Sequence, residues 1–291
     1  MRILLTGGSG QVGREVLQRS GHRQILAPDR QAMDLSSVDS IRSWLDREQP
    51  QLILSVGAYT AVDQAEDEAE LAYQVNRDAV AVLAEYANAR KAPLIHLSTD
   101  YVFDGSKPAP YVESDTPAPS GVYGASKLAG EVAAQQAEQH LILRVSWVFG
   151  AKGANFVRTM LRIGTDRDQL NVVDDQIGGP TWAGHIAEHL CTLVDRHEQG
   201  QTLPTGLWHC GGAPFLSWCE FATTIFRQAT DMELIERAPD VMPIPSSEYP
   251  TKAQRPANSR LDSSQARHAL GLETPDWRIG LEETLNELRA S

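Results

Sequence analysis

The sequence begins with MRILLTGGSGQVG, residues 1–13, and this stretch decides the fold. An apolar run predicts a strand over residues 2–6, which leads directly into three glycines spaced three apart, Gly7, Gly10 and Gly13. The run after Gly13 has the pattern of a helix. A sharp turn from strand to helix directs free backbone N–H groups toward one point, and glycine lets a pyrophosphate approach that backbone closely. We therefore predict a dinucleotide site at this turn.

The composition limits the class of protein. With 291 residues, 42% hydrophobic and 22% charged, the chain is typical of a globular protein with one or two domains and a substantial core. Its net charge of −12 argues against nucleic acid or an anionic membrane surface as a partner. We expect neither a membrane span nor a signal peptide, because no apolar stretch is long enough and the glycine turn interrupts the N-terminus. Three cysteines without paired-ligand spacing favour a reduced, cytoplasmic setting.

Strand-like and helix-like segments alternate through the first half of the sequence. Apolar runs typical of buried strands lie at 51–56, 94–98 and 141–145, with a shorter strand at 24–28. This alternation predicts an α/β fold, a Rossmann-type doubly wound parallel sheet with right-handed crossovers. Small residues that follow the run at 51–56 mark the carboxyl edge of the sheet, where such folds bind ligands.

The alternation loosens after residue 148. We expect residues 1–148 to form the dinucleotide-binding domain, with part of 181–210 returning to it. Residues 149–291 are expected to form mainly a smaller α/β substrate domain. The stretch from Pro239 to Leu261 is too long for a simple connector, which predicts a functional loop over the cleft. Further helices are expected at 71–88, 123–139, 155–163, 184–197, 217–229 and 278–289, and a further strand at 207–210.

The end of the second strand carries two charges that bear on cofactor choice. Asp29 lies nineteen residues after Gly10, about where a dinucleotide fold places the acid that binds the adenosine ribose. A carboxylate there accepts hydrogen bonds from both ribose hydroxyls and repels a 2′-phosphate, whereas Arg30 beside it has the opposite preference. The choice between NADH and NADPH therefore stays open, as does the alternative of a loop with two solvated charges.

The strongest chemistry lies in YGASK, residues 123–127. Tyr123 and Lys127 are four apart, so on a helix they lie on one face. A free phenol has a pKa near ~10, and an ammonium group beside it stabilises the phenolate and lowers that pKa toward neutrality. Thr99 ends a predicted buried strand at the ligand-binding edge. The motif alone occurs by chance on surface helices, but its order after the glycine turn and the threonine predicts a proton-transfer site.

A second motif suggests a different class of site. His185, Glu188 and His189 fit the His-x-x-Glu-His pattern of some zinc peptidases. Catalytic zinc needs a third protein ligand, and no partner segment is apparent. The apolar residues at helical spacing around the motif favour core packing instead, so we expect no metal there.

These features together resemble the extended short-chain dehydrogenase/reductase superfamily, and within it the dTDP-4-dehydrorhamnose reductase family. The resemblance runs almost from end to end. Besides the glycine turn, it rests on AVDQAE (61–66), STDYVF (98–103), VYGASKLAGE (122–131) and RVSWV (144–148). The most family-specific piece is RPANSRL, residues 255–261.

The resemblance implies hydride transfer from NADPH or NADH to the C4 ketone of dTDP-4-dehydro-L-rhamnose, in the synthesis of a precursor for cell-surface polysaccharide. Tyr123 is implied to donate the proton to the developing alkoxide. Lys127 is implied to lower the pKa of Tyr123 and to hold the nicotinamide ribose. Thr99 is implied to hydrogen-bond the carbonyl oxygen, where charge grows in the transition state.

The resemblance also implies binding residues. Cofactor contacts are expected at Gly7, Gly10, Gln11, Val12 and Gly13 for the pyrophosphate, Asp29 or Arg30 for the adenosine ribose, Asp34 and Leu35 near adenine, and Ala58, Tyr59 and Thr60 along the cofactor. Asp100 and Trp147 are expected to line the sugar pocket. Asn155 and Arg255 are candidates for the nucleotide diphosphate, because the guanidinium fork suits phosphate; structural loop contacts are the alternative for both. Family members are often homodimers, some with magnesium at the interface.

Three other functions compete with reduction. A sugar-nucleotide dehydratase typically carries two adjacent acids after the strand-end threonine, whereas here Asp100 is followed by Tyr101. Epimerisation is harder to exclude from the residues. A non-enzymatic, dinucleotide-binding regulatory subunit is disfavoured because Tyr123, Lys127 and Thr99 are all present.

Overall fold

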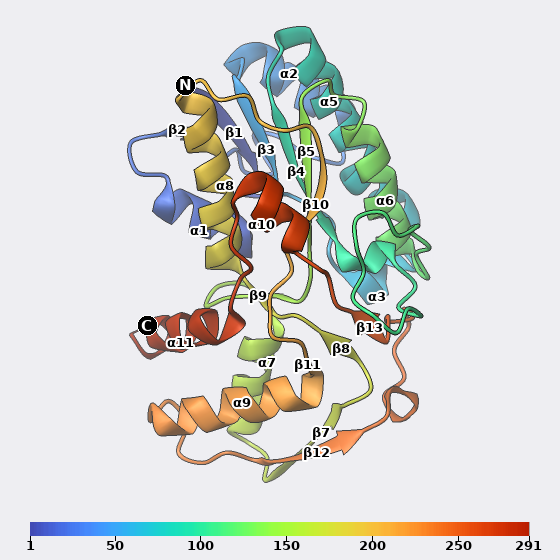
Figure 1. The fold of residues 1–291 in the computed structure, drawn as a ribbon, viewed down its shortest axis with the longest axis vertical. Helices are drawn as coiled ribbons and strands as arrows, with labels where there is room; N and C mark the ends of the chain where they lie inside the picture. The colour runs from blue at the N-terminus through green and yellow to red at the C-terminus, as the bar shows by residue number, and fades with distance from the viewer. Residues whose placement is uncertain (291) are drawn as a thin grey trace.

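The computed structural model describes residues 1–290, and its centre is a six-stranded parallel sheet (Figure 1). The strand order is β10-β5-β4-β3-β1-β2, so the chain starts inside the sheet and winds outward in both directions. All five strand pairs are parallel. The strands are β1 (Arg2–Thr6), β2 (Gln24–Leu26), β3 (Leu52–Ser55), β4 (Leu94–Thr99), β5 (His140–Val145) and β10 (Gly206–His209).

Helices cover both faces of this sheet (Figure 1). Successive side chains of β1 point to opposite faces of the sheet, and both faces are apolar. Ile3 and Leu5 pack against one set of helices, and Leu4 packs against the other. The first set is α1 (Gln11–Arg19), α8 (Ala183–Glu198) and α10 (Ser264–Leu270), and the second includes α2 (Val38–Glu48), α5 (Ala79–Arg90) and α6 (Val122–Ala134). The predicted doubly wound α/β fold is therefore confirmed.

A second lobe lies beyond the carboxyl edge of the sheet, below it in Figure 1. Aromatic and aliphatic side chains of its three helices form a separate core, which includes Phe221, Phe226 and Trp277. The lobe consists of α7 (Phe156–Gly164), α9 (Trp218–Asp231) and α11 (Trp277–Arg289), with β7 (Gln169–Val173) paired to β12 (Asp240–Ile244), β6 (Val148–Phe149) paired to β9 (Thr181–Trp182), and a sheet of β11 (Leu216–Ser217), β8 (Ile177–Gly178) and β13 (Asn258–Ser259). Within residues 1–290 no helix combines the length and the hydropathy needed to span a bilayer.

Two predicted helices differ from the structure. The helix expected over 71–88 is divided into α4 (Ala69–Tyr73), a π-helical segment η1 (Gln74–Asp78) and α5. Within η1 the Asn76 side chain forms hydrogen bonds in both directions with the Tyr59 backbone, and such bulges often mark functional sites. The helix expected over 123–139 ends earlier, at Ala134, because Asn88 binds the backbone of Gln136 and Glu138 and diverts the chain toward β5.

The stretch 239–261 was expected to be a loop, and this is wrong for its first part. Residues 240–244 form β12, which runs parallel to β7. The remainder, apart from the short helix η3 (Ser246–Glu248) and β13, is irregular and reaches the helix α3 (Val62–Ala65) of the first lobe. There the Ala253 N–H donates to the Asp63 carboxylate at 3.0 Å. This segment therefore bridges the two lobes on the side of the candidate site.

Candidate active site

The glycine turn between β1 and α1 is as tight as the sequence predicted. Gly7 has a φ of +69°, and a Cβ there would lie 2.6 Å from the Cα of Gly57. A Cβ at Gly13 would lie 2.1 Å from the Gly7 carbonyl oxygen. Helix α1 begins at Gln11, and no side chain of residues 1–290 caps its first N–H groups. An anion at the turn can therefore accept those hydrogen bonds, so the residues present fit a dinucleotide pyrophosphate.

The loop after β2 holds the residues expected at the adenosine end. The Asp29 carboxylate accepts the backbone N–H of Ala32 at 2.9 Å and so stabilises its own turn. Arg30 is 76% exposed, with Asp34 3.6 Å away. Hydrogen bonds from the backbone and hydroxyl of Ser36 lower the pKa of Asp34. Leu35 packs at Gly57, which places this loop beside the glycine turn.

The segment after β3 is fixed by a residue that the sequence analysis missed. Asn76 accepts the Tyr59 N–H at 2.9 Å and donates to the Tyr59 carbonyl and to the hydroxyl of Ser126 on α6. The Tyr59 hydroxyl donates to Glu68 at 2.8 Å. The segment 58–60, which was expected along the cofactor, is therefore tied to α6. A polar residue, Asn76, at a buried position in an apolar helical run was the available signal.

Tyr123 and Thr99 meet at the carboxyl edge of the sheet. Thr99 is the last residue of β4, and its side chain lies close enough to Tyr123, in the first turn of α6, to lower the pKa of the phenol. The Thr99 hydroxyl donates to Asp100 at 3.1 Å. Burial raises the pKa of Tyr123 to about 12, against the opposing effect of Thr99. The phenol is therefore protonated at neutral pH, which is the state a proton donor needs.

Lys127 lies one turn after Tyr123 and is 3% exposed. Its ammonium group donates to the Leu97 carbonyl oxygen on β4 at 2.7 Å. Burial lowers the pKa of Lys127 to about 8, although Glu131 acts in the opposite direction. The expected lowering of the Tyr123 pKa is not found in this structure, because burial of the phenol outweighs the other effects.

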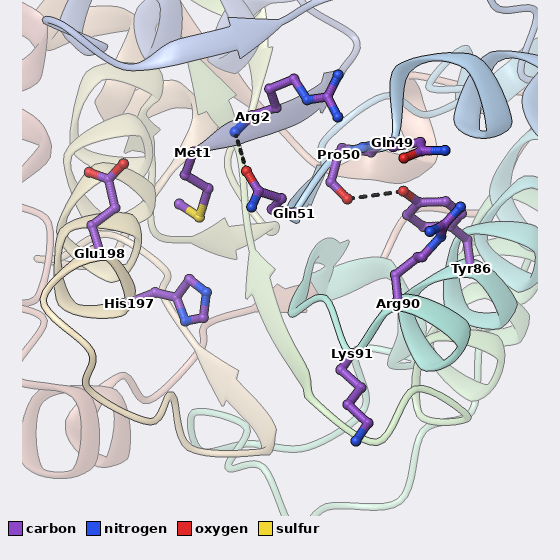
Figure 2. Close-up of a pocket in the computed structure, with 10 residues that line it drawn as sticks. All are labelled: Met1, Arg2, Gln49, Pro50, Gln51, Tyr86, Arg90, Lys91, His197 and Glu198. Carbon is purple, nitrogen blue, oxygen red and sulfur yellow. Dashed lines mark hydrogen bonds between the residues drawn. The ribbon is translucent and has the colours of Figure 1, made fainter.

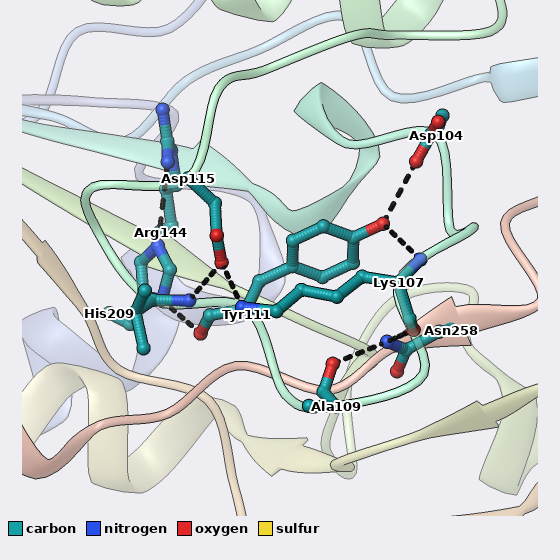
Figure 3. Close-up of polar contacts among 9 residues, drawn as sticks. Asp104, Lys107, Ala109, Tyr111, Asp115, Arg144, His209 and Asn258 are labelled. Atoms are coloured by element: carbon teal, nitrogen blue, oxygen red, sulfur yellow. Dashed lines mark hydrogen bonds and ion pairs between the residues drawn. The ribbon is translucent and has the colours of Figure 1, made fainter.

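A buried ion pair behind Lys127 was also missed. Arg144 on β5 binds both carboxylate oxygens of Glu131 on α6, at 2.8 and 2.7 Å, and both residues are almost fully buried. Ser98 donates to the same carboxylate, and Arg144 contacts His209 at 3.4 Å. Figure 3 shows Arg144 and His209 together beside the loop that carries Tyr111. An arginine inside an otherwise apolar strand was the sequence signal, since a buried charge requires a partner.

Asp100 and Trp147 lie at the same edge of the sheet as Tyr123 and Thr99. Asp100 is 3% exposed, and burial raises its pKa to about 6, although hydrogen bonds from Ser259 and Thr99 act against the shift. Trp147 follows β5 by two residues, and the last residue of β5, Val145, pairs with Thr99. The two residues expected to line the sugar pocket therefore lie at the same edge of the sheet as the proton donor.

Asn155 and Arg255, expected together at a diphosphate, lie in different places. The Asn155 side chain caps α7 through Arg158 and donates to Gln11 at 2.9 Å and to Gly150 at 2.8 Å. These contacts tie the second lobe to the glycine turn. Arg255 lies at α3, where it forms an ion pair with Asp63 at 3.1 Å.

The zinc motif shows the contacts of ordinary packing. Glu188 interacts with Arg19 at 3.5 Å, and the His185 ring packs edge-on against Trp182. Among residues 1–290 no group of three or more His, Cys, Asp or Glu side chains is arranged to hold a metal ion.

A cavity of about 740 Å³ lies at the opposite end of the sheet. Figure 2 shows Met1, Arg2 and Gln51, from the starts of β1 and β3, beside residues from the ends of α2, α5 and α8. The amino ends of the strands form this cavity, whereas Tyr123, Thr99 and the glycine turn lie at the carboxyl ends. It is therefore separate from the candidate active site.

Comparison with known proteins gives a consistent result. Residues 1–290 match the family model described as RmlD substrate binding domain. The chain is 43% identical to a dTDP-4-dehydrorhamnose reductase of Aggregatibacter actinomycetemcomitans, over 96% of this chain and 97% of the relative. It is 39% identical to the Escherichia coli K12 protein of that name, over 99% and 98% of the two chains.

Solved structures agree with these sequence matches. The dTDP-4-dehydrorhamnose reductase of Bacillus anthracis, solved in complex with NADP, superposes with a TM-score of 0.87 at 33% identity, covering 98% of this chain and 99% of that one. A UDP-glucose 4-epimerase of Thermus thermophilus, at 18% identity and a TM-score of 0.78 over the full length of both chains, shares the fold alone. At the identities found with the reductases, over nearly the whole length, the chain belongs to the family of dTDP-4-dehydrorhamnose reductases.

Proposed function

We propose that this protein reduces the C4 ketone of dTDP-4-dehydro-L-rhamnose to give dTDP-L-rhamnose, with NADPH or NADH as the reductant. The observation that supports this most directly is the placement of Tyr123 beside Thr99 at the carboxyl edge of the sheet, one helical turn from Lys127. Membership of the reductase family gives the same chemistry and substrate class.

The side chains of this site supply the proton and the charge stabilisation. A bound reduced nicotinamide supplies the hydride. Tyr123, which is protonated at neutral pH, donates its proton to the oxygen that develops negative charge at C4. The Thr99 hydroxyl donates a hydrogen bond to the same oxygen, which strengthens as the charge grows. The Lys127 ammonium group, held by the Leu97 carbonyl, stabilises negative charge left on the phenolate.

Cofactor contacts are proposed along the turn and the strand ends that follow it. Gly7, Gly10, Gln11, Val12 and Gly13 hold the pyrophosphate, Asp34 and Leu35 lie near adenine, and Ala58, Tyr59 and Thr60 extend toward the nicotinamide. We propose a preference for NADPH, because Asp29 is engaged by its own turn while Arg30, next to it, has an exposed guanidinium group suited to a 2′-phosphate. Replacement of Arg30 by Ala is expected to raise the KM for NADPH and leave that for NADH unchanged.

We also propose that the two lobes bind different ligands. Residues 1–148, together with part of 181–210, bind the dinucleotide, and residues 149–291 mainly bind the sugar nucleotide. Asp100 and Trp147 line the sugar pocket, and Arg255, held in place by its ion pair with Asp63, contacts the diphosphate. For Asn155 a structural role is favoured by its contacts with α7, Gln11 and Gly150. The homodimer, the interfacial magnesium and the cytoplasmic setting remain predictions.

The test is a cofactor-oxidation assay with both nicotinamides against a panel of 4-keto sugar nucleotides that differ in base and sugar. Stoichiometric oxidation of NADPH with dTDP-4-dehydro-L-rhamnose, and formation of dTDP-L-rhamnose, are the expected results. Epimerised product without net cofactor oxidation would replace the reductase proposal by an epimerase. Binding of dinucleotide without turnover of any sugar in the panel would favour the regulatory subunit.

A further inference from the structure

Trp147 has a backbone conformation that a bulky residue rarely adopts. Its φ is +47°, in the left-handed region, which is unfavourable for a bulky side chain unless the surroundings hold the residue there. The Trp147 carbonyl accepts the Thr181 N–H at 3.2 Å, and the preceding Ser146 hydroxyl donates to the Gly179 carbonyl at 2.8 Å. Strain of this kind persists at functional sites when neighbouring groups fix the geometry, so the contacts of the indole ring itself are informative.

One face of the Trp147 indole is covered by Trp218. The two rings are stacked with centroids 3.4 Å apart and planes inclined by only 7°. Trp218 is the first residue of α9, directly after Ser217, whose hydroxyl and backbone form a capping box with Glu220. Its ring also contacts Phe156 at a centroid distance of 4.5 Å. The second lobe therefore presents a firmly held indole to a residue at the edge of the central sheet.

The opposite face of Trp147 is covered by the backbone of Gly178. A Cβ placed on Gly178 would lie 2.3 Å from Cε2 of Trp147 and 2.7 Å from both of its neighbours, Cζ2 and Nε1. If this Cβ position lay in the plane of the indole ring, it would be closer to Nε1 than to Cε2. The three distances therefore place it over the face of the ring. No Trp218 atom is among the three nearest to that Cβ position, and Gly178 therefore lies on the face that Trp218 leaves free.

We infer that Trp218 is a positioning residue for substrate binding, which together with Gly178 clamps the Trp147 indole so that its edge, and not its face, meets the sugar. This rests on the proposed function, in which Trp147 lines the sugar pocket. The clamp belongs to the small sheet of the second lobe: Gly178 pairs with Leu216, two residues before Trp218, and with Ser259. A glycine is required at 178 because any side chain would displace the indole.

The two sides of the clamp allow two independent perturbations. Trp218→Ala removes one wall, and Gly178→Ala forces the indole away from the other. Each is expected to raise the KM for dTDP-4-dehydro-L-rhamnose by about tenfold or more, since small displacements of a binding group have effects of this size. The KM for NADPH is expected to change by less than about twofold, because neither indole belongs to the residues proposed to hold the cofactor. Trp218→Phe retains a flat ring and is expected to restore the sugar KM to within about threefold of wild type.

Circular dichroism reports the stack independently of activity. Two indoles at this separation couple and give an exciton couplet in the far ultraviolet, which Trp218→Ala and Trp218→Phe both abolish. Trp44→Phe, which removes a buried indole from α2 in the first lobe, is the matched control and is expected to retain the couplet and the wild-type KM. Calorimetric binding of dTDP-L-rhamnose to each folded variant is measured in parallel.

The outcomes separate this inference from the proposed function. An active wild-type enzyme whose far-ultraviolet spectrum is unchanged by Trp218→Ala, or whose Trp218→Ala and Gly178→Ala variants keep the wild-type sugar KM, overturns the clamp and leaves the reductase proposal intact. Equal changes in the KM of both substrates would indicate general destabilisation and would also overturn it. A wild-type protein that neither turns over nor binds the dTDP-sugar overturns the proposed function, and the clamp's assigned role with it.

Discussion

At the scale of single residues, burial raises the pKa of two groups in the site, the Tyr123 phenol and the Asp100 carboxyl. Replacement of Tyr123 by Phe removes the proposed proton donor without changing the ring. We expect kcat to fall at least ~100-fold with cofactor binding retained, as is usual when a general acid is lost. Tyr101→Phe is the matched control, since its ring packs edge-on against Tyr123 at 5.4 Å. Similar loss of kcat in both variants would contradict the role of Tyr123.

The buried carboxyl of Asp100 predicts an unusual dependence of stability on pH. Because its pKa is raised to about 6 in the folded protein, the folded state binds more protons than the unfolded state between pH ~4 and ~6. The favourable contribution of protonated Asp100 is complete below its ordinary pKa and is lost as the pH rises through about 6. Asp100→Asn is therefore expected to stabilise the protein relative to wild type by about 3 kcal/mol at pH 7 and by much less near pH 4.

Urea unfolding of wild type and Asp100→Asn at several pH values measures this difference. Asp34→Asn is the control of opposite sign, because hydrogen bonds from Ser36 lower the pKa of Asp34. Its carboxylate stabilises the folded state above the ordinary pKa, and that contribution is lost as the pH falls. A difference between wild type and Asp100→Asn that stays constant from pH 4 to pH 7 would show that the Asp100 pKa is not raised.

At the scale of elements, the buried pair of Glu131 and Arg144 joins α6 to β5 beside Lys127. Glu131→Gln leaves the arginine charge buried without its carboxylate and is expected to cost about 3–5 kcal/mol of unfolding free energy. The double variant with Leu at both positions is expected to lose much less, because an apolar pair removes both desolvation costs. Denaturant unfolding of Glu131→Leu, Arg144→Leu and the double Leu variant gives the coupling energy.

An exposed ion pair provides the comparison for this cycle. Arg42 and Glu85 join α2 to α5 at 2.9 Å, with side chains 54% and 66% exposed, and are expected to couple by less than ~1 kcal/mol. Equal coupling energies for the buried and the exposed pair would contradict the structural role assigned to Glu131.

The same elements show how far the sequence could predict the structure. Apolar runs identified β1, β3, β4 and β5, because burial on both faces of a parallel sheet leaves a continuous apolar pattern. The π-helical break at Asn76 and the early end of α6 depend on hydrogen bonds between residues far apart in the sequence, which no local pattern contains. The strand β12 was missed for a related reason: its mixed, mostly exposed residues gain regular structure only by pairing with β7.

The residues of the candidate site also fall into a predicted group and a missed group. Motif spacing predicted Tyr123, Lys127 and Thr99, and the structure brings these three to one edge of the sheet. Their supports, among them Asn76, Glu131 and Trp218, come from other elements and depend on tertiary packing. The sequence could indicate that such residues need partners, but not which partners they find.

At the scale of the whole molecule, the segment from Ser246 to Ala257 ties the second lobe to the first at α3. Asp63 forms an ion pair with Arg255 and accepts the Ala253 N–H, and a further ion pair joins Lys252 to Asp67. The pKa of Asp63 is lowered, chiefly by the Ala253 hydrogen bond and also by Arg255. These contacts connect segments about 190 residues apart, so they restrain the two lobes relative to each other.

Release of this tie is expected to loosen the segment and weaken substrate binding. Asp63→Ala removes both the backbone hydrogen bond and the ion pair, whereas Asp63→Asn keeps an acceptor for the Ala253 N–H and removes only the charge. Hydrogen exchange of residues 246–257 is therefore expected to be fastest in Asp63→Ala and intermediate in Asp63→Asn. The KM for the sugar nucleotide is expected to rise in the same order, by about tenfold in Asp63→Ala, with the KM for NADPH unchanged.

Asp67→Asn tests whether the effect on the segment depends on the position of the carboxylate and not only on its charge. Its carboxylate is 66% exposed and lacks the backbone hydrogen bond of Asp63, so exchange and KM are expected to remain close to wild type. If Asp67→Asn and Asp63→Ala loosen the segment equally, the tie is a diffuse electrostatic attraction. If exchange of 246–257 in Asp63→Ala equals that of wild type, then α3 does not hold the segment, and the two lobes are joined through the Trp147–Trp218 stack and the Asn155–Gln11 contact instead.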